Sequence, residues 1–159
     1  MVLAGGTTPA ALYRALAEED LDWRNWHLYF GDERCLPADD AERNSVMVAR
    51  NWLDRVSTPP PEVFVIPAER GPEKAAESYT PVVRDALPFD LVLLGAGEDG
   101  HTASLFPGHY HPGHELVHAV NDAPKPPPRR VSLGYAALNT AGQVLFLVTG
   151  KTKANMVKR

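Results

Sequence analysis

The sequence predicts an α/β fold in which helices cover both faces of a doubly wound, mostly parallel, Rossmann-like sheet. Short apolar runs, typical of buried strands, alternate along the chain with longer segments of helical periodicity. Glycine-rich or acidic turns follow several of these runs. With 159 residues, 44% hydrophobic and 23% charged, the chain suits one soluble α/β domain over residues 1–159.

The first strand is expected at Val2 to Ala4, and it leads into the loop Gly5-Gly6-Thr7-Thr8-Pro9. A helix should follow, with Thr8 as its N-cap and Pro9 at the first helical position. Backbone N–H groups and two hydroxyls at a helix N-terminus could hold a phosphate. An ordinary strand-to-helix connection explains the loop equally well. No Gly-Lys-Ser/Thr follows, so this is not a Walker A loop.

The second strand, Trp26 to Phe30, runs into Gly31-Asp32-Glu33-Arg34. Two carboxylates and a guanidinium at the carboxyl end of a strand could hold a substrate, and Arg34 suits forked contacts with phosphate oxygens. A solvated surface turn with a local ion pair is the alternative. The polar loop continues to Asn44, and the apolar stripe of a helix from Val46 to Leu53 should pack in the core.

The stiff segment Thr58-Pro59-Pro60-Pro61 should connect this helix to a strand at Val63 to Ile66, and Gly71-Pro72-Glu73 should open another helix. The next strand, Leu91 to Leu94, is an unbroken apolar run. It stops at Gly95, as a buried parallel strand stops at its carboxyl end.

A glycine-rich turn, Gly95 to His101 (GAGEDGH), follows this strand where ligands bind in open α/β sheets. His101 is therefore a functional candidate, although a solvated histidine in a turn is the plain alternative. The glycines also match a dinucleotide GxGxxG. No strand ending in an acidic residue lies about 20 residues on, and Glu98 and Asp99 stand where a pyrophosphate needs a neutral or basic cradle. The spacing leaves open which of these two acids contacts His101.

The chain after this turn is less regular. Four histidines suggest a metal site, but Pro112-Gly113 interrupts any helix and no cysteine or dense carboxylate set completes a ligand shell. We expect them on a variable surface loop before a short strand at Val117 to Val120. The histidines are His109, His111, His114 and His118.

The segment Ala123 to Arg130 (APKPPPRR) leads straight into a strand at Arg130 to Leu133. Its prolines should fix an extended backbone and hold the flanking cations in place. A surface polyproline ligand for an adaptor is the alternative. A last strand is expected at Gln143 to Val148, and a helical pattern begins at Lys151.

Charge and composition exclude several classes of protein. The net charge of −4 does not fit a nucleic-acid binder. No apolar run reaches the roughly 20 residues of a membrane helix, so no membrane association is expected. The single cysteine, Cys35, excludes an internal disulfide and fits a reducing cytoplasm, where it is expected to be a small buried hydrophobe.

Four stretches resemble the 6-phosphogluconolactonase family, which shares its fold group with glucosamine-6-phosphate deaminase. They are LAGGTTP at Leu3 to Pro9, GDERCLP at Gly31 to Pro37, GAGEDGHTASLFPG at Gly95 to Gly108, and PKPPPRRVSL at Pro124 to Leu133. The resemblance extends over nearly the whole chain. It implies hydrolysis of 6-phospho-D-glucono-1,5-lactone to 6-phospho-D-gluconate in the oxidative pentose phosphate pathway, without a required metal or nucleotide cofactor.

The same resemblance implies roles for individual residues. His101 would be the general base that activates water, and Asp99 the acid that orients it. The phosphate would be bound by the cations Arg34, Lys125 and Arg130, where Arg130 rather than Arg129 fits the spacing KPPPxR. The remaining substrate contacts would be Gly5, Gly6, Thr7, Asp32, Asn44 and Gly97.

The chemistry of a lactone agrees with this assignment. A lactone is an activated ester, so a histidine with the ordinary pKa of about 6.5 can serve as base at neutral pH. The tetrahedral intermediate needs N–H donors or cations, and a glycine-rich loop can supply the donors. Ser104 lies in the motif but lacks a GxSxG elbow, so no acyl-enzyme is expected.

The family normally has a further helix and strand before LAGG and continues well past Lys153, so we expect this chain to lack elements at both ends. Their loss would expose sheet edges and favour self-association or instability. A non-catalytic sugar-phosphate sensor or an inactive remnant is therefore one alternative. An amino-sugar-phosphate deaminase or isomerase is another, but Asp32-Glu33-Arg34, the ending Leu105 to Gly108 and the segment Lys125 to Arg130 favour a lactonase.

Overall fold

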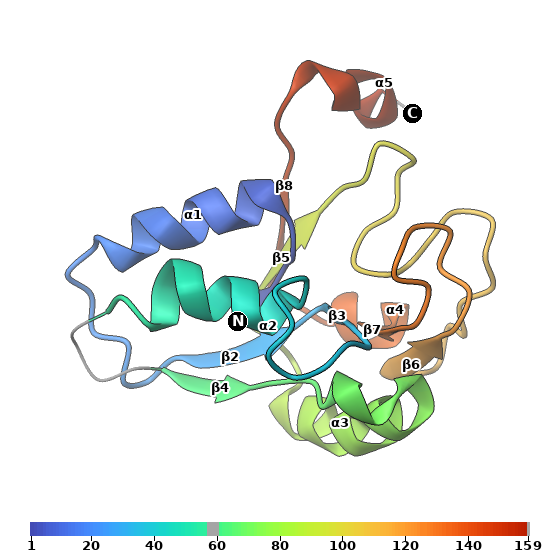
Figure 1. The fold of residues 1–159 in the computed structure, drawn as a ribbon, viewed down its shortest axis with the longest axis horizontal. Helices are drawn as coiled ribbons and strands as arrows, with labels where there is room; N and C mark the ends of the chain where they lie inside the picture. Colours follow the sequence, from blue (N-terminus) through green and yellow to red (C-terminus); the bar gives the residue numbers. More distant parts are fainter. Residues whose placement is uncertain (57–60, 159) are drawn as a thin grey trace.

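The main sheet of the computed structural model has five parallel strands in the order β4-β2-β1-β5-β8 (Figure 1). The structure describes residues 1–56 and 61–158, so all of the predicted connector Thr58 to Pro61 except Pro61 lies outside the described residues. The strands of this sheet are β1 (Val2–Leu3), β2 (His27–Phe30), β4 (Glu62–Phe64), β5 (Leu91–Gly95) and β8 (Gln143–Leu147).

The strand order confirms the predicted doubly wound topology. The chain begins in the middle of the sheet, moves outward through β2 and β4, and then returns to place β5 on the other side of β1. Val2 pairs with both Tyr29 of β2 and Val92 of β5. Because the connections leave β1 and β5 in opposite directions, a crevice opens at their carboxyl ends.

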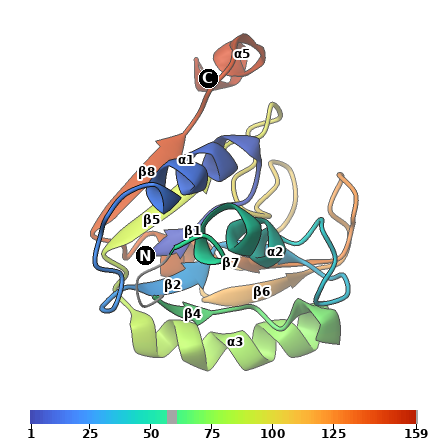
Figure 2. The same cartoon turned by 60° about the vertical axis from the view of Figure 1, so that its left-hand side comes forward.

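Helices lie on both faces of this sheet, as predicted (Figure 2). One face carries α1 (Thr7–Ala17) and α2 (Asn44–Val48), which continues as the π-helical turn η1 (Ala49–Leu53). Tyr13 of α1 stacks on Trp52 of η1, with the ring centres 5.9 Å apart. The opposite face carries α3 (Pro72–Ala86).

The start of α1 differs from the prediction that Thr8 is the N-cap. Gly6 precedes the helix with a φ of 107° and takes the N-cap position. The Thr8 hydroxyl instead lies 2.8 Å from the Thr149 hydroxyl, beyond the end of β8. The turn therefore uses a conformation that favours glycine, and the threonine side chain is directed away from its own helix.

A second sheet, which the sequence did not reveal, is antiparallel and has the order β3-β7-β6. Its strands are β3 (Asp32–Arg34), β6 (Val117–Val120) and β7 (Arg130–Leu133). Strands at residues 117–120 and 130–133 were predicted, but residues 31–34 were expected in a polar loop after the second strand, with a solvated surface turn as the alternative. That expectation was wrong because Asp32 and Glu33 find partners that allow both carboxylates to be buried.

Backbone N–H groups take the place of water as hydrogen-bond donors to the buried Glu33 carboxylate. It has no exposed surface, and its oxygens accept hydrogen bonds from the N–H groups of Arg34 (2.9 Å), Asn44 (2.7 Å) and Ser45 (2.8 Å). Two of these donors belong to the first turn of α2, whose N–H groups lack intrahelical acceptors. Glu33 therefore fixes the start of α2 against β3.

The Arg43 guanidinium supplies the counter-charge for Glu33 and is also buried. Its Nε lies 3.4 Å from Glu33 Oε2, and its Nη1 lies 2.9 Å from Glu69 Oε2. Its Nη2 donates to the carbonyl of Ile66 at 2.7 Å. This arginine therefore joins β3 to the segment that leads from β4 into α3.

The remaining elements are short: η2 (Ala68–Arg70), α4 (Tyr135–Leu138), η3 (Lys151–Lys153) and α5 (Ala154–Val157). Cys35 is half-buried, and burial raises the pKa of its thiol to about 11. No helix among residues 1–56 and 61–158 is long and apolar enough to cross a membrane.

Strand β8 forms one edge of the main sheet, and its apolar side chains are exposed. Val144, Leu145 and Phe146 retain 44%, 49% and 55% of their accessible surface. The chain continues from β8 to α5, which projects beyond the sheet (Figure 1) and brings Met156 close to Gly100. The edge strand thus presents both unpaired backbone and apolar side chains.

Replacing Glu33 by alanine is expected to lower the free energy of unfolding by about 3–5 kcal/mol. The variant leaves buried N–H groups of α2 without an acceptor and removes one partner of the Arg43 guanidinium. Glu62→Ala is the matched control, because the Glu62 side chain is 63% exposed. Its effect should stay within about 0.5 kcal/mol. Urea titration measures both, and equal stability of the two variants would contradict the role given to Glu33.

Candidate active site

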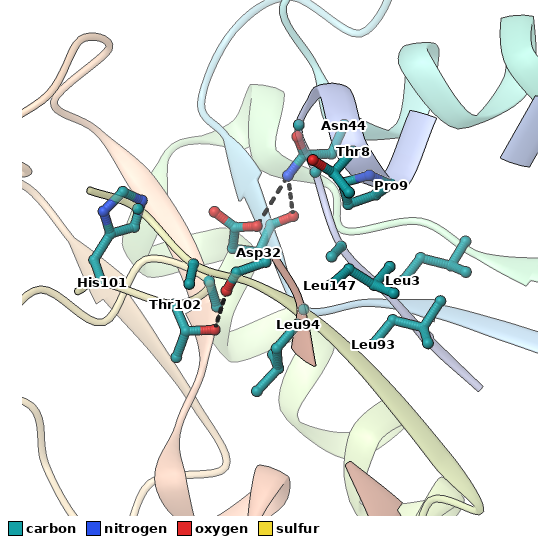
Figure 3. Close-up of a pocket in the computed structure, with 18 of the residues that line it drawn as sticks. Leu3, Thr8, Pro9, Asp32, Asn44, Leu93, Leu94, His101, Thr102 and Leu147 are labelled. Atoms are coloured by element: carbon teal, nitrogen blue, oxygen red, sulfur yellow. Dashed lines mark hydrogen bonds between the residues drawn. The ribbon is translucent and has the colours of Figure 1, made fainter. Parts of the chain in front are cut away.

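A cavity of about 220 Å³ lies at the carboxyl ends of β1 and β5 (Figure 3). This is the crevice created by the strand order, and ligands of open α/β sheets bind at this position. Leu3, Leu94 and Leu147 from the ends of three neighbouring strands line its apolar part. Most of the polar lining comes from β3 and β7 of the second sheet, from the starts of α1 and α2, and from the turn that holds His101.

The loop before α1 and the first residues of that helix form one wall. Gly5, Gly6, Thr7 and Thr8 all line the cavity. Glycine has no side chain that could cap the first N–H groups of a helix, so Gly6 leaves the positive end of α1 open toward the cavity. This wall can receive an anion.

Asp32 and Asn44 line the cavity and are hydrogen-bonded to each other. The Asn44 amide turns toward Asp32 and donates to its Oδ1 and to its carbonyl oxygen, each at 2.9 Å (Figure 3). Ser104 Oγ donates to the other carboxylate oxygen at 2.7 Å. A Cβ at Gly5 would overlap the Asn44 side chain. Gly5 is therefore needed for Asn44 to reach this position, and Ser104 is a buried structural contact.

His101 and Asp99 form a direct pair beside the cavity. His101 Nδ1 lies 2.6 Å from Asp99 Oδ1, and the two side chains are 19% and 36% exposed. The structure thus identifies Asp99, and not Glu98, as the acid that contacts His101. A carboxylate can only accept a hydrogen bond, so the hydrogen of neutral His101 is assigned to Nδ1 and the lone pair to Nε2.

Asp99 also receives a cation. Lys125 Nζ lies 3.1 Å from the same Oδ1, so the carboxylate bridges a histidine and a lysine. Partial burial by itself would raise the pKa of Asp99, but hydrogen bonds from His101 and Lys125 outweigh it and lower the pKa to about 2. Asp99 is therefore ionised at every pH at which a histidine titrates.

The turn from Gly95 to His101 is closed by its own backbone. Gly97 N donates to the His101 carbonyl at 2.8 Å, and Gly100 N donates to the Gly97 carbonyl at 3.0 Å. These two N–H groups are used within the loop, so they do not serve as the oxyanion donors that the sequence suggested. A Cβ at Gly97 would overlap both the His101 ring and the Asp99 carboxylate. Glycine is thus required for the pair to form.

Three cations line the cavity: Arg34, Arg130 and Lys153. Arg34 Nη1 donates to the Glu42 carbonyl. Lys153 was not predicted as a site residue, although its place shortly after the last strand is the same signal that identified His101. Lys125, which was predicted to bind phosphate, is not among the lining residues and lies on Asp99 instead.

The proline-rich segment holds Arg130 through backbone carbonyls. Arg130 Nε donates to the Pro127 carbonyl at 2.9 Å, and Nη2 donates to those of Lys125 (2.9 Å) and Pro126 (3.1 Å). Burial is the largest influence on this guanidinium and lowers its pKa. The proline-rich segment thus holds Arg130 in place, as predicted. The groups that hold it are backbone carbonyls.

The four later histidines are not all on the surface. His118 is on β6 and only 3% exposed. His111 Nδ1 lies 3.2 Å from His118 Nε2. Within the described ranges, no group of three or more histidine, cysteine, aspartate or glutamate side chains is placed to hold a metal ion.

Gly97→Ala is expected to separate the His101 ring from Asp99, because the added methyl group occupies the space of both. NMR of the His101 ring nitrogens should show loss of the hydrogen-bonded Nδ1 proton. Gly113→Ala is the matched control, since a Cβ there meets no atom within 4 Å. Retention of the Nδ1 signal in Gly97→Ala would contradict the packing described above.

Comparison with known proteins finds relatives in sequence and in structure. A family model described as glucosamine-6-phosphate isomerases/6-phosphogluconolactonase matches residues 1–159. The chain is 39% identical to human 6-phosphogluconolactonase over 170 residues, covering 99% of this chain and 66% of the human protein. It is 40% identical to the Streptomyces coelicolor 6-phosphogluconolactonase over 179 residues, covering 99% of this chain and 68% of that protein.

A solved structure shares the fold. The crystal structure of 6-phosphogluconolactonase from Thermotoga maritima matches with a TM-score of 0.90 and 37% sequence identity, covering 99% of this chain and 72% of that one. This chain therefore spans about two thirds of the length of the relatives that it matches. The matches of sequence and of fold together show that the chain belongs to the glucosamine-6-phosphate isomerase/6-phosphogluconolactonase family.

Proposed function

We propose that this chain hydrolyses 6-phospho-D-glucono-1,5-lactone to 6-phospho-D-gluconate, the second step of the oxidative pentose phosphate pathway. The observation that carries the proposal is the His101–Asp99 pair, 2.6 Å apart, beside a cavity that three cations line. An ester hydrolase needs a base for water, and a phosphorylated sugar needs cations. The names of the relatives at 39% and 40% identity support the same activity.

In the proposed mechanism, His101 acts as general base and Asp99 positions it. Asp99 accepts the hydrogen at Nδ1, so Nε2 takes a proton from water as the water oxygen attacks the lactone carbonyl carbon. The tetrahedral intermediate collapses by cleavage of the ring C–O bond. His101 returns the proton to the departing ring oxygen, which becomes a hydroxyl of the open-chain acid.

The phosphate group of the substrate is proposed to lie between the start of α1 and the cations. Gly6 and Thr7 offer the N-terminal end of the helix, and Arg34 and Arg130 offer guanidinium groups. Lys153 adds a third charge from the segment after β8. Lys125 contacts Asp99. We therefore propose that the main role of Lys125 is to hold Asp99 ionised, and that its contribution to phosphate binding is smaller.

The remaining predicted contacts concern the sugar ring. We propose that Asn44 and the backbone at Gly5 and Gly97 face it, because all three line the cavity. Asp32 lines the cavity as well, but hydrogen bonds from Asn44 and Ser104 occupy its carboxylate oxygens. Its proposed contribution to binding is to orient Asn44.

We also propose that residues 1–159 form one cytoplasmic domain and that the exposed edge of β8 allows copies to associate. One hydrophobic core includes residues of the main sheet, the second sheet and the helices on both faces, which supports a single domain. The exposed apolar side chains Val144, Leu145 and Phe146 support association. Sedimentation at rising protein concentration tests this part.

His101→Ala is expected to reduce lactonase activity by about 10²- to 10⁴-fold, because the base that activates water is lost. The assay uses freshly made 6-phosphoglucono-1,5-lactone, with spontaneous hydrolysis subtracted. His114→Ala is the control, since His114 is an exposed histidine outside the cavity. Equal activity of the two variants would refute the role of His101.

The same assay separates the alternatives. If the unaltered chain is folded but inactive, it is a sugar-phosphate sensor or a remnant. Turnover of glucosamine 6-phosphate instead of the lactone would make it an amino-sugar-phosphate deaminase or isomerase.

Lys153→Met is expected to raise KM for the phosphorylated lactone by about 10- to 100-fold, because a charge-assisted contact of roughly 1.5–3 kcal/mol is lost. Hydrolysis of unphosphorylated glucono-1,5-lactone should be almost unchanged. Lys151→Met is the matched control, since Lys151 is exposed and does not line the cavity. A parallel loss for both lactones would place Lys153 elsewhere in the reaction.

A further inference from the structure

Phe106 lies behind the candidate active site and contacts two of its charged or titratable groups. Its ring centre is 4.6 Å from that of His101, with the planes tilted by 32°. The guanidinium carbon of Arg130 lies 5.6 Å from the same ring centre. The Phe106 side chain is 2% exposed and packs with Val120 and Ala123. Its position therefore limits where His101 and Arg130 can lie.

His111 fixes the main chain at Phe106. The Phe106 N–H group donates to His111 Nε2 at 2.8 Å. A backbone amide at ordinary pH always carries its hydrogen, so Nε2 must be the accepting nitrogen, and neutral His111 carries its hydrogen on Nδ1. The carbonyl oxygen of Phe106 also lies 3.1 Å from Nε2, but it accepts no hydrogen bond from a nitrogen that carries no hydrogen.

His118 completes the chain of hydrogen bonds. His111 Nδ1 lies 3.2 Å from His118 Nε2, so the His111 hydrogen is donated to His118. His118 must then carry its own hydrogen on Nδ1, which has no partner among the described residues. Burial, followed by repulsion from His111, lowers the pKa of His118 to about 4. The acceptor at Nε2 is thus preserved at neutral pH.

We propose that the His111–His118 pair positions the active site by holding Phe106 against His101 and Arg130. The two histidines have the same tautomer, and the direction of the hydrogen bonds is Phe106 to His111 to His118. Neither ring lines the catalytic cavity, so both are positioning residues. The kinetic consequence rests on the proposed lactonase activity, whereas the tautomers and the placement of His101 do not.

The spectroscopic test uses the full chain. Long-range proton–nitrogen NMR should show both His111 and His118 protonated on Nδ1 near neutral pH. In His111→Leu the ring signals of His101 should shift, because Phe106 loses its backbone acceptor. His111→Gln should keep them near their original values, since its side-chain oxygen can accept the same N–H group. His114→Leu is the control in the same loop and should leave the His101 signals in place.

The kinetic test compares the same variants. His111→Leu should lower kcat/KM for 6-phosphoglucono-1,5-lactone by roughly 10- to 100-fold, because small displacements of a catalytic group are costly. His111→Gln should recover most of the loss, and His114→Leu should have the activity of the unaltered chain. Loss in His111→Leu without recovery in His111→Gln would indicate a purely steric role and overturn the proposal.

Two further outcomes would overturn it. One is an Nε2-protonated His111, and the other is a His101 spectrum that is the same in His111→Leu and His114→Leu.

If His111→Leu does not fold, Phe106→Leu replaces it, because this variant removes the ring and keeps the N–H group. It should shift the His101 signals while His111 keeps its tautomer. An inactive unaltered chain would refute the lactonase activity alone, because the NMR results still decide the positioning role.

Discussion

The burial of two adjacent carboxylates in β3 is the constraint on which the rest of the site depends. Asp32 and Glu33 are 6% and 0% exposed, which is costly for charged groups without partners. Glu33 is satisfied by Arg43 and by backbone N–H groups at the start of α2. Asp32 is satisfied by Asn44 and Ser104. These contacts tie α2, the second sheet and the loop after His101 together around one cavity.

Close approach of side chains to backbone then shapes the cavity. Gly5 and Gly97 are both positions where a Cβ would overlap a group of the site, the Asn44 amide in one case and the His101–Asp99 pair in the other. Glycine is required at these two positions because a side chain would overlap the site. Backbone conformation is not the reason, since neither residue has a positive φ. By contrast, the φ of 107° at Gly6 makes glycine the favoured residue at the start of α1.

The charges of the site are oriented mainly by uncharged groups. Carbonyls of the proline-rich segment hold Arg130, a carbonyl holds Arg34, and the Phe106 ring lies against both Arg130 and His101. Such contacts fix direction without neutralising the cation, so the cavity keeps its attraction for an anion. An ion pair at its border, between Asp99 and Lys125, helps to keep the partner of His101 ionised.

The sequence by itself determined the doubly wound α/β fold, because apolar runs, helical periodicity and glycine turns are local patterns. It also determined that His101 follows a central strand, where ligands bind. Only the tertiary structure decided that residues 32–34 form a strand, that Asp99 rather than Glu98 contacts His101, and that Lys153 lines the cavity while Lys125 does not. The physical reason is that burial of a charge and the direction of a side chain in a glycine-rich loop depend on partners far away in the sequence. For Asp32 that partner is Ser104, and for Asp99 it is Lys125.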